Sequence, residues 1–347
     1  MTPGASAPIV SSNDPDSPLR IGTRASDLAL TQSGHVGEAV VAGTGREVEL
    51  VHVSTHGDRD LTSPLARIGG TGVFVTAVRQ ALLDGEVDVI VHSWKDLPTA
   101  PLEEITLACT PVREDPRDAL CARDGMGLAD LPLGAKVGTG SPRRGAQLLR
   151  NRPDLEVVGI RGNVQTRLNR ALGPEADLDA VVLAASGLRR VGLESVISEV
   201  LPVDVMLPAP AQGALAVEAT TAALAEQPWF DERLAAVDDP ATRAAVTAER
   251  SLLRTLEAGC SAPVAAYAEF EEPTEGEQSE NVRVLRLRAL AIRLDGRHVV
   301  EGEARMALDL AADPLSGPDS VPAALGAELA ADLLSRGAGD ILAEARA

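Results

Sequence analysis

Three kinds of side chain are scarce in this sequence: lysine, the aromatics and cysteine. Only Lys95 and Lys136 are lysines among 32 basic residues, and aromatic residues make up 2% of the chain. The apolar residues, 45% of the total, are therefore mainly Ala, Val and Leu, and they suffice for aliphatic cores. At roughly 100–200 residues per domain, the chain of 347 residues accommodates two or three domains.

Positive charge is also in short supply, since the formal net charge is −19 and the pI is about 4.7. A nucleic-acid or anionic-membrane partner calls for a basic face, so we expect neither. No apolar run approaches the ~20 residues of a membrane span. The three cysteines (Cys109, Cys121 and Cys260) have no metal-like spacing and cannot all pair internally, which indicates a reducing compartment.

Several familiar motifs are missing as well. The sequence offers no Ser-His-Asp set and no metal site, and the Gly-rich segment 69–72 lacks the Gly-Lys-Ser/Thr ending of a P-loop. Residues 1–18 have neither the charged head nor the apolar core of a signal peptide. We expect a disordered tail there.

The order of predicted elements indicates an α/β fold. Strands and helices alternate twice, which is typical of βαβαβ units with parallel sheets. The first series comprises strands at 19–23, 48–54 and 87–91, with helices opening at 24–28 and running over 73–83. The second comprises strands at 136–140, 155–160 and 179–184, with helices opening after Ser141 and after Arg161. Proline-rich segments at 106–117 and 207–213 are predicted connections between lobes, and 214–218 a strand that returns to the first lobe.

The composition shifts near residue 240, where a smaller α+β domain is predicted. Its elements are a helix at 241–256, strands at 263–270, 283–294 and 297–307, and helices at 322–336 and 339–345. Residues 269–280 hold many glutamates and no basic residue, which predicts a solvated hairpin loop.

The stretch 87–98 is a candidate site. A short apolar strand ends there in His92, Ser93, Lys95 and Asp96, and Pro98 prevents a regular continuation. Ligands of parallel α/β sheets bind just beyond the carboxyl ends of strands. For this stretch alone, a solvated turn with a surface ion pair is the simpler interpretation.

Arginines recur where strands end or helices begin. Helix N-termini normally prefer acidic residues, so basic residues repeated there favour a shared anionic ligand. The alternative is salt bridging to the protein's own excess of carboxylates. For any single arginine that alternative is preferred, but for the whole set we favour the ligand. The set comprises Arg24, Arg143, Arg144, Arg161, Arg167 and Arg190.

Cys260 lies in a predicted loop just past a helix C-terminus, between Gly259 and Ser261. A free cysteine is usually a small buried hydrophobe, and Cys109 and Cys121, in apolar runs, fit that description. A thiol in a Gly/Ser turn is less easily explained as core. A helix C-terminus does not lower a thiol pKa from its ordinary value.

Taken together, the sequence resembles the porphobilinogen deaminase (hydroxymethylbilane synthase) family. The matching segments run in family order from about residue 19 onward. They are RIGTRAS (20–26), PLARIGGTGVF (64–74), VHSWKDLP (91–98), REDPRD (113–118), VGTGSPRR (137–144), RGNVQTR (161–167), PAQG (210–213) and LEAGC (256–260).

The resemblance implies a fold and a domain plan. The fold class is α/β, with two periplasmic-binding-protein-like lobes that have mostly parallel sheets, plus a small α+β C-terminal domain. The implied divisions are a tail at 1–18, lobe 1 at 19–112 plus 212–232, lobe 2 at 117–206, and a C-terminal domain at 238–347.

The resemblance also implies an activity. Family members are cytoplasmic, monomeric transferases of tetrapyrrole (porphyrin and haem) biosynthesis. They join four porphobilinogen molecules head to tail into 1-hydroxymethylbilane and release ammonia at each step. Asp96 matches the catalytic aspartate, and Cys260 matches the cysteine that carries a dipyrromethane cofactor through a thioether. Positions that hold acetate and propionate groups of cofactor and substrate match Arg24, Ser26, Ser93, Lys95, Thr139, Ser141, Arg143, Arg144, Arg161, Arg167, Arg190 and Gln212.

The chemistry agrees with these implied roles. Loss of ammonia leaves an electron-poor azafulvene, and the attack that follows places positive charge on pyrrole nitrogens. A carboxylate such as that of Asp96 stabilises this charge selectively and can move protons. Every added pyrrole brings two carboxylates, so the growing chain needs several arginines.

Two positions depart from the family pattern, which often has lysine at Arg67 and Thr71. Thr71 removes a charge from the Gly-rich loop, so that loop lacks a cation with which family members often contact substrate. Two rival functions are open: a two-lobed anion-binding protein without catalysis, which needs neither Asp96 nor Cys260, and a different cytosolic transferase on the same lobes, which leaves the Cys260 loop unexplained.

Overall fold

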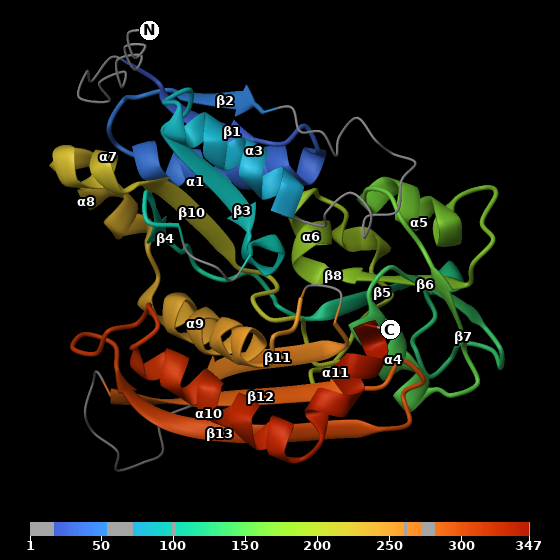
Figure 1. Cartoon of the computed structure of the whole chain (residues 1–347). Helices are drawn as coiled ribbons and strands as arrows, with labels where there is room; N and C mark the ends of the chain where they lie inside the picture. The colour runs from blue at the N-terminus through green and yellow to red at the C-terminus, as the bar shows by residue number, and fades with distance from the viewer. Residues whose placement is uncertain (1–16, 54–71, 99–101, 260–261, 272–281, 347) are drawn as a thin grey trace, which may run out of the picture. The chain divides into compact units, whose positions relative to one another are not determined.

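The computed structural model describes residues 17–53, 72–98, 102–259, 262–271 and 282–346, with the backbone alone at 72–74. The chain forms two compact units, Met1–Val112 with Leu215–Asp239, and Arg113–Ala214 with Pro240–Ala347 (Figure 1). Among the described residues, no helix is both long enough and apolar enough to cross a membrane. The N-terminal tail 1–16, the Gly-rich loop at 69–71 and most of the predicted acidic loop lie outside the described residues.

The first unit is built on a mixed five-stranded sheet in the order β2-β1-β3-β10-β4. Its strands are β1 (Leu19–Thr23), β2 (Val48–His52), β3 (Val89–Ser93), β4 (Ile105–Cys109) and β10 (Leu215–Thr220). β1 pairs in parallel with β2 and β3, whereas β10 runs antiparallel to β3 and β4. The carboxyl ends of β1 and β3 therefore lie at the same edge of the sheet.

Helices cover both faces of this sheet. They are α1 (Asp27–Val41), α3 (Gly72–Leu83), α7 (Thr221–Glu226) and α8 (Pro228–Val237). Val36 of α1 and Phe230 of α8 belong to the core on one face, together with Val89 of β3. Val78 of α3 belongs to the core on the other face, together with Ile90. Successive residues of β3 thus enter different cores, as expected for a strand covered on both sides.

The second unit contains another mixed five-stranded sheet, in the order β7-β6-β8-β5-β9. Its strands are β5 (Asp118–Ala122), β6 (Lys136–Thr139), β7 (Glu156–Gly159), β8 (Ala180–Ala184) and β9 (Glu199–Val200), and its helices are α4 (Pro142–Asn151), α5 (Val164–Leu172) and α6 (Ala185–Arg190). β6 pairs in parallel with β7 and β8, whereas β5 runs antiparallel to β8 and β9. In both sheets, therefore, a single strand opposes the direction of the other four.

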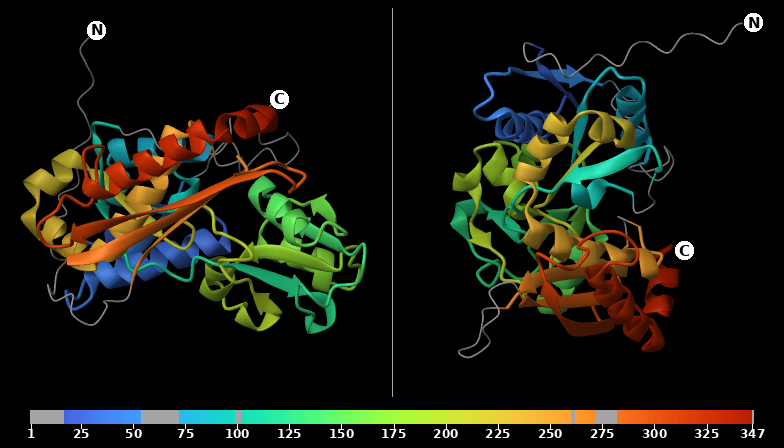
Figure 2. Two further views of the ribbon diagram at one scale, coloured as in Figure 1. Left: turned by 90° about the horizontal axis from the view of Figure 1, so that it is seen from below. Right: turned by 90° about the vertical axis from the view of Figure 1, so that its left-hand side faces the viewer.

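The same unit carries a three-stranded antiparallel sheet of β11 (Val264–Phe270), β12 (Val282–Ile292) and β13 (Val299–Asp309). α9 (Pro240–Thr255), α10 (Val321–Ser335) and α11 (Ala338–Arg346) cover one face of it (Figure 2). Leu290 and Ile292 point to the opposite face and pack against Ala146 of α4. Short 3-10 turns complete the described chain: η1 (Trp94–Asp96), η2 (Arg123–Gly125) and η3 (Glu194–Val196).

The predicted α/β class and the smaller α+β part are confirmed, as is the return strand, which is β10. Two predictions were wrong in detail, and some elements were not predicted. The strand placed at 87–91 is paired at Val89–Ser93, because its polar end finds partners on β10. The connection placed at 106–117 contains most of β4, which pairs with β10. Strands β5 and β9 and helices α7 and α8 had no counterpart in the prediction.

Candidate functional site

Asp96 lies on a short turn at the carboxyl end of β3. The turn η1 begins directly after Ser93, and the N–H of Leu97 donates to the carbonyl of Trp94 at 3.1 Å. Trp94 and Leu97 are each 5% exposed, whereas Asp96 is exposed and Lys95 is half-buried. Two buried apolar side chains therefore anchor the turn and leave its carboxylate open to solvent.

The start of α1 lies at the same sheet edge as this turn, since β1 and β3 are parallel neighbours. Ser26 caps α1 by accepting the N–H of Ala29 at 3.4 Å, and Arg24 is exposed just before it. Ser93 donates its hydroxyl to Oε1 of Gln32 on α1 at 3.1 Å. The structure thus brings the predicted site residues of the first unit to one edge of one sheet.

A corresponding arrangement occurs at the carboxyl end of β6 in the second unit. Ser141 caps α4 by accepting the N–H of Arg144 at 3.4 Å, and Pro142 occupies the first turn of the helix. Thr139 is buried at the strand end, and its hydroxyl accepts the N–H of Ser141 at 3.2 Å. The N-terminus of α4 therefore presents a hydroxyl and a helix dipole, a combination that favours anions.

Arg143 and Arg144 are buried, at 3% and 6% exposure, and both are paired with the fully buried Asp118. Arg143 Nη1 donates to Asp118 Oδ2 at 2.7 Å, and Arg144 Nε donates to Oδ1 at 2.8 Å. Burial alone would raise the pKa of Asp118, but the two guanidinium charges outweigh it and hold this pKa at about 2. Two cations therefore share one anion and leave an excess positive charge at the start of α4.

Gln212 joins the same network from the segment before β10. Its amide nitrogen donates to Asp118 Oδ1 at 2.8 Å and to the carbonyl of Pro116 at 2.7 Å, and its oxygen accepts from Arg144 Nη2 at 3.2 Å. The sequence prediction had placed Gln212, Arg143 and Arg144 among the ligand contacts. What the structure shows is that these three side chains contact one another or Asp118, which lies between them.

Of the remaining predicted arginines of the second unit, Arg161 lies in the loop after β7, Arg167 lies on α5 and Arg190 is the last residue of α6. Arg161 is exposed at the end of β7, and Arg167 Nε donates to the carbonyl of Gly162 at 2.8 Å. Arg190 ends α6 and donates to the carbonyl of Gly213 at 2.7 Å, and burial lowers the pKa of this guanidinium. Since β6 is parallel to β7 and β8, the carboxyl ends of these strands, which lead into α5 and α6, share an edge of the sheet.

Cys260, Arg67 and Thr71 lie outside the described residues. Cys109 and Cys121 lie on β4 and β5, form no disulfide and are fully buried, as the sequence predicted for structural cysteines. Burial raises the pKa of Cys121 to about 12, so this thiol is not reactive near neutral pH.

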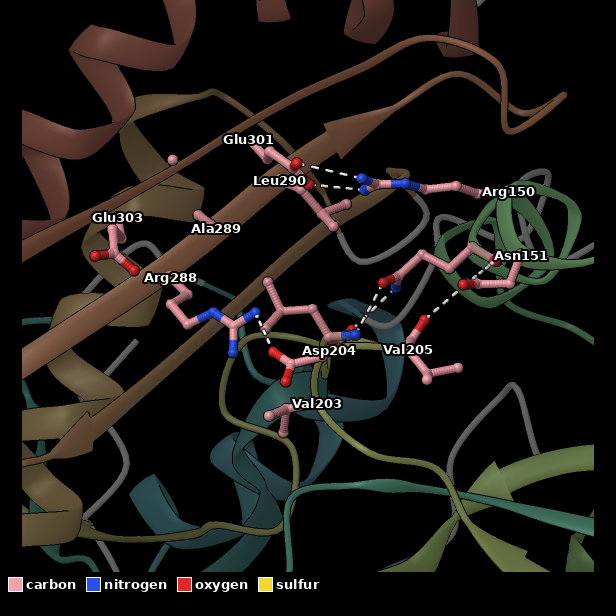
Figure 3. Close-up of a pocket in the computed structure, with 13 residues that line it drawn as sticks. Arg150, Asn151, Val203, Asp204, Val205, Arg288, Ala289, Leu290, Glu301 and Glu303 are labelled. Carbon is pink, nitrogen blue, oxygen red and sulfur yellow. Dashed lines mark hydrogen bonds and ion pairs between the residues drawn. The ribbon is translucent and has the colours of Figure 1, made fainter. Parts of the chain in front are cut away.

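A polar pocket of about 410 Å³ lies elsewhere in the second unit, where the end of α4 meets the loop 203–207 and strands β12 and β13 (Figure 3). Arg150 donates to both oxygens of Glu301 at 2.7 and 3.2 Å, and Arg288 pairs with Asp204 at 2.7 Å. None of the predicted site residues lines this pocket. Arg150, Glu301, Arg288 and Asp204 pair with one another, and Glu303 pairs with Arg286 and Arg305 outside the pocket, so we assign it no ligand.

The comparison with protein families decides the class of this chain. The family model described as "Porphobilinogen deaminase, dipyromethane cofactor binding domain" matches residues 19–226, and the one described as "Porphobilinogen deaminase, C-terminal domain" matches residues 243–335. The chain belongs to the porphobilinogen deaminase family. The family resemblance drawn from the sequence motifs is therefore confirmed.

Relatives named porphobilinogen deaminase align with this chain over nearly their whole length. A porphobilinogen deaminase of Thermobifida fusca (strain YX) is 52% identical over 332 residues, which cover 95% of this chain and 97% of the relative. Porphobilinogen deaminase 1 of Streptomyces coelicolor is 50% identical over 330 residues, covering 94% and 98%. The porphobilinogen deaminase of Cutibacterium acnes is 47% identical over 333 residues, covering 94% and 97%.

The described residues fit the dipyrromethane group of porphobilinogen deaminases, which is rich in carboxylates. The start of α4 carries the excess positive charge of Arg143 and Arg144, and Arg143 Nε is buried without a hydrogen-bond partner among the described residues. A buried donor of this kind is costly unless a partner reaches it. A carboxylate of the group is a suitable partner for Arg143, together with Ser141 and Thr139.

The sequence prediction did not single out three acidic residues that are buried in this porphobilinogen deaminase family member. They are Asp118, Glu218 and Glu249, each 4% exposed or less. A signal was present for each. Asp118 opens an entirely apolar run, and Glu218 interrupts another. Glu249 lies four residues from the buried Ala245 and Leu253, on the apolar face of α9. A carboxylate in such a position needs a cationic partner.

Proposed function

We propose that this protein is an active porphobilinogen deaminase. It joins four porphobilinogen molecules head to tail into 1-hydroxymethylbilane and releases one ammonia at each step. It acts as a cytoplasmic monomer on a small-molecule substrate, without nucleic acid or membrane. The observation that carries this proposal is the pair of family matches, which together span the cofactor-binding and C-terminal regions.

The cofactor in this proposal is a dipyrromethane bound to Cys260 through a thioether. When bound, it supplies the pyrrole carbon onto which the first porphobilinogen is joined. Thr139, Ser141, Arg143 and Arg144 would hold its carboxylates at the start of α4. Gln212, predicted from the sequence as a further contact, would support them through its hydrogen bonds with Arg144 and Asp118. A covalent anchor keeps the product chain on the protein through all four additions.

Asp96 is the catalytic residue in this mechanism. Its carboxylate is exposed at the sheet edge, on a turn that Trp94 and Leu97 fix by burial. Departure of ammonia and carbon–carbon bond formation both place positive charge on substrate pyrrole nitrogens. A carboxylate beside those nitrogens stabilises that charge and takes and returns the protons.

Arg24, Ser26, Ser93 and Lys95 bind substrate carboxylates in the first unit, and Arg161, Arg167 and Arg190 do so in the second. Guanidinium groups suit this role because they match carboxylates with two parallel hydrogen bonds. The chain has a net charge of −19, so most of its surface repels an anionic substrate. Binding is thereby confined to the arginine-bearing edges of the two sheets.

A three-domain organisation accompanies this function: lobe 1 at 19–112 with 212–232, lobe 2 at 117–206, and a C-terminal domain at 238–347 with Cys260 near its start. The connection predicted at 106–117, of which residues 110–117 lie beyond β4, and the segment 205–213 are proposed hinges that let the site accommodate a growing chain.

The intact mass of the purified protein tests the proposal. We expect an excess over the sequence mass equal to two linked pyrroles in the wild type, and no excess in Cys260→Ser. Cys109→Ala is the matched control, because it removes a thiol that is buried in the first unit, and it should keep the excess. An unmodified mass in a protein that is active on porphobilinogen would refute the attachment at Cys260.

A further inference from the structure

Three ionisable side chains of the first unit meet on one face of its sheet. Arg79 of α3 donates from Nε and Nη2 to the two carboxylate oxygens of Glu218 on β10, at 2.9 and 2.5 Å. His92 of β3 places Nε2 3.3 Å from Glu218 Oε2, without the alignment of a hydrogen bond. The side chains are 11%, 5% and 11% exposed. We call them the Arg79–Glu218–His92 triad.

The pairing of β3 with β10 explains why these groups meet. Glu218 lies opposite Ile90 in the antiparallel register, and His92 is two residues farther along β3. Residues two apart on a strand share a face, so His92 and Glu218 point to the side of Ile90. Ile90 packs there against Val78 of α3, the helix that also carries Arg79.

The next residue of β3 is held from the opposite face. Ser93 donates to Gln32 of α1 at 3.1 Å, and Gln32 is itself buried. The last two residues of the strand are thus fixed by polar contacts on both sides of the sheet. Asp96 follows only three residues later, on the turn that begins at Trp94.

The Glu218 carboxylate is charged at all ordinary pH values. Burial would raise its pKa, but contacts with Arg79 and His92 outweigh burial and lower this pKa to about 2. Neutralising Glu218 would leave the Arg79 guanidinium buried without its anion and would remove the contact with His92. The helix and the strand end would then have to rearrange, since an unpaired buried charge is strongly disfavoured.

We propose that the Arg79–Glu218–His92 triad is a positioning device for Asp96. It fixes the end of β3 so that the turn Trp94–Asp96 presents its carboxylate in one orientation. The inference rests on the proposed function, in which Asp96 is the catalytic group. Displacement of a catalytic group by about 1 Å lowers rates by roughly 100-fold, so a device of this kind has a kinetic signature.

The test compares Glu218→Gln with Asp88→Asn. The control removes the pairing of Asp88 with Arg20, a partly buried ion pair at the opposite end of β3. We expect Glu218→Gln to lower kcat by about 10- to 100-fold with KM within about two-fold, because Asp96 acts mainly in the transition state. Asp88→Asn should keep kcat while it lowers the melting temperature. Arg79→Lys, which retains the charge, should recover part of kcat relative to Arg79→Met.

The double variant Arg79→Met/Glu218→Gln guards against misfolding, because it removes the buried pair without leaving a lone charge. It should show the same loss of kcat. A readout without activity is hydrogen exchange at Trp94–Leu97, which should speed up about ten-fold in the triad variants and not in Asp88→Asn.

Failure of this inference is distinguishable from failure of the proposed function. A wild type that is inactive on porphobilinogen refutes the function, and the exchange rates then still decide whether the triad fixes the turn. If the wild type is active but Glu218→Gln loses only thermal stability, or changes KM alone, the triad is an ordinary buried ion pair. Unchanged exchange at Trp94–Leu97 in the triad variants would overturn the proposal as well.

Discussion

Arg113 and Glu249 form a bidentate ion pair in the second unit. Arg113 Nη1 donates to Glu249 Oε1 at 2.7 Å, and Nη2 donates to Oε2 at 3.0 Å. The fully buried Glu249 also accepts the backbone N–H of Ala211 at 2.6 Å and of Ala268 at 2.8 Å. Arg113 Nε donates in turn to the carbonyl of Gln212 at 2.9 Å. One carboxylate of α9 thereby ties both connecting segments to β11.

We therefore predict that Glu249→Gln strongly destabilises the second unit. An amide cannot neutralise Arg113 or accept all four hydrogen bonds, and removing one partner of a buried pair costs about 3 kcal/mol or more. Urea denaturation should show this loss in the free energy of unfolding. Glu156→Gln is the matched control, since its pairing with Lys136 spans 3.9 Å between exposed groups, and it should leave the midpoint unchanged. Equal midpoints for the two variants would contradict the role of Glu249.

The close packing of Gly296 leads to a second prediction, which concerns the turn between β12 and β13. Gly296 has φ +76°, and a Cβ on it would lie 2.6 Å from the backbone nitrogen of Arg150 and 2.7 Å from the carbonyl oxygen of Ala146, both on α4. Gly134 has nearly the same φ, +73°, with no atom within 4 Å of its Cβ position. Gly134→Ala should therefore report backbone strain alone, on the order of 1 kcal/mol.

Gly296→Ala should lower the melting temperature well beyond Gly134→Ala, because helix backbone must move to admit the methyl group. The difference between the two variants measures how closely the β12–β13 turn is packed on α4. Comparable melting temperatures would show that the turn can lift away from the helix freely.

Asp118 gives the protein a specific acid sensitivity. The pKa of Asp118 in the folded state is about 2, below the ordinary value of 3.8, so its charge stabilises the native state. That contribution is complete above about pH 4 and is lost as the pH falls toward 2. By linkage it amounts to about 2 kcal/mol over this window.

We expect the free energy of unfolding to fall more shallowly with acid in Asp118→Asn than in the wild type between pH 4 and 2. The wild-type carboxyl can also be followed directly by ¹³C NMR, which keeps the prediction testable if the variant does not fold. An ordinary pKa for Asp118 in that titration would show that Arg143 and Arg144 do not lower the pKa of this carboxyl.

Local sequence signals located most elements because they arise from neighbouring residues. Ser26 and Ser141 stand at the starts of α1 and α4, and each accepts a backbone N–H of the first helical turn. The strands β4 and β5 were not predicted, since their pairing partners, β10 and β8, lie far away along the chain. No local pattern shows which distant strand will cover an edge.

The candidate site shows the same difference between local signals, which the sequence reveals, and distant contacts, which it does not. Motifs singled out Arg143 and Arg144, but their counter-ion Asp118 lies 25 and 26 residues away along the sequence, and only folding brings it between them. The boundary of β3 was misplaced by two residues for a related reason. His92 and Ser93 are polar, but they continue the strand because their side chains contact Glu218 on one face of the sheet and Gln32 on the other.

The last prediction concerns Asp96→Asn. The substitution keeps the shape of an exposed side chain on a turn that Trp94 and Leu97 anchor, so the protein should fold with its melting temperature unchanged and keep its mass excess. An amide cannot stabilise positive charge on a pyrrole nitrogen or accept its proton, so turnover of porphobilinogen should fall by about 100-fold or more. Asp84→Asn is the control, since Asp84 is exposed in the same unit just after α3 and should retain full turnover. A near-normal rate for Asp96→Asn would mean that another group carries the chemistry. The Arg79–Glu218–His92 triad would then have no catalytic group to position.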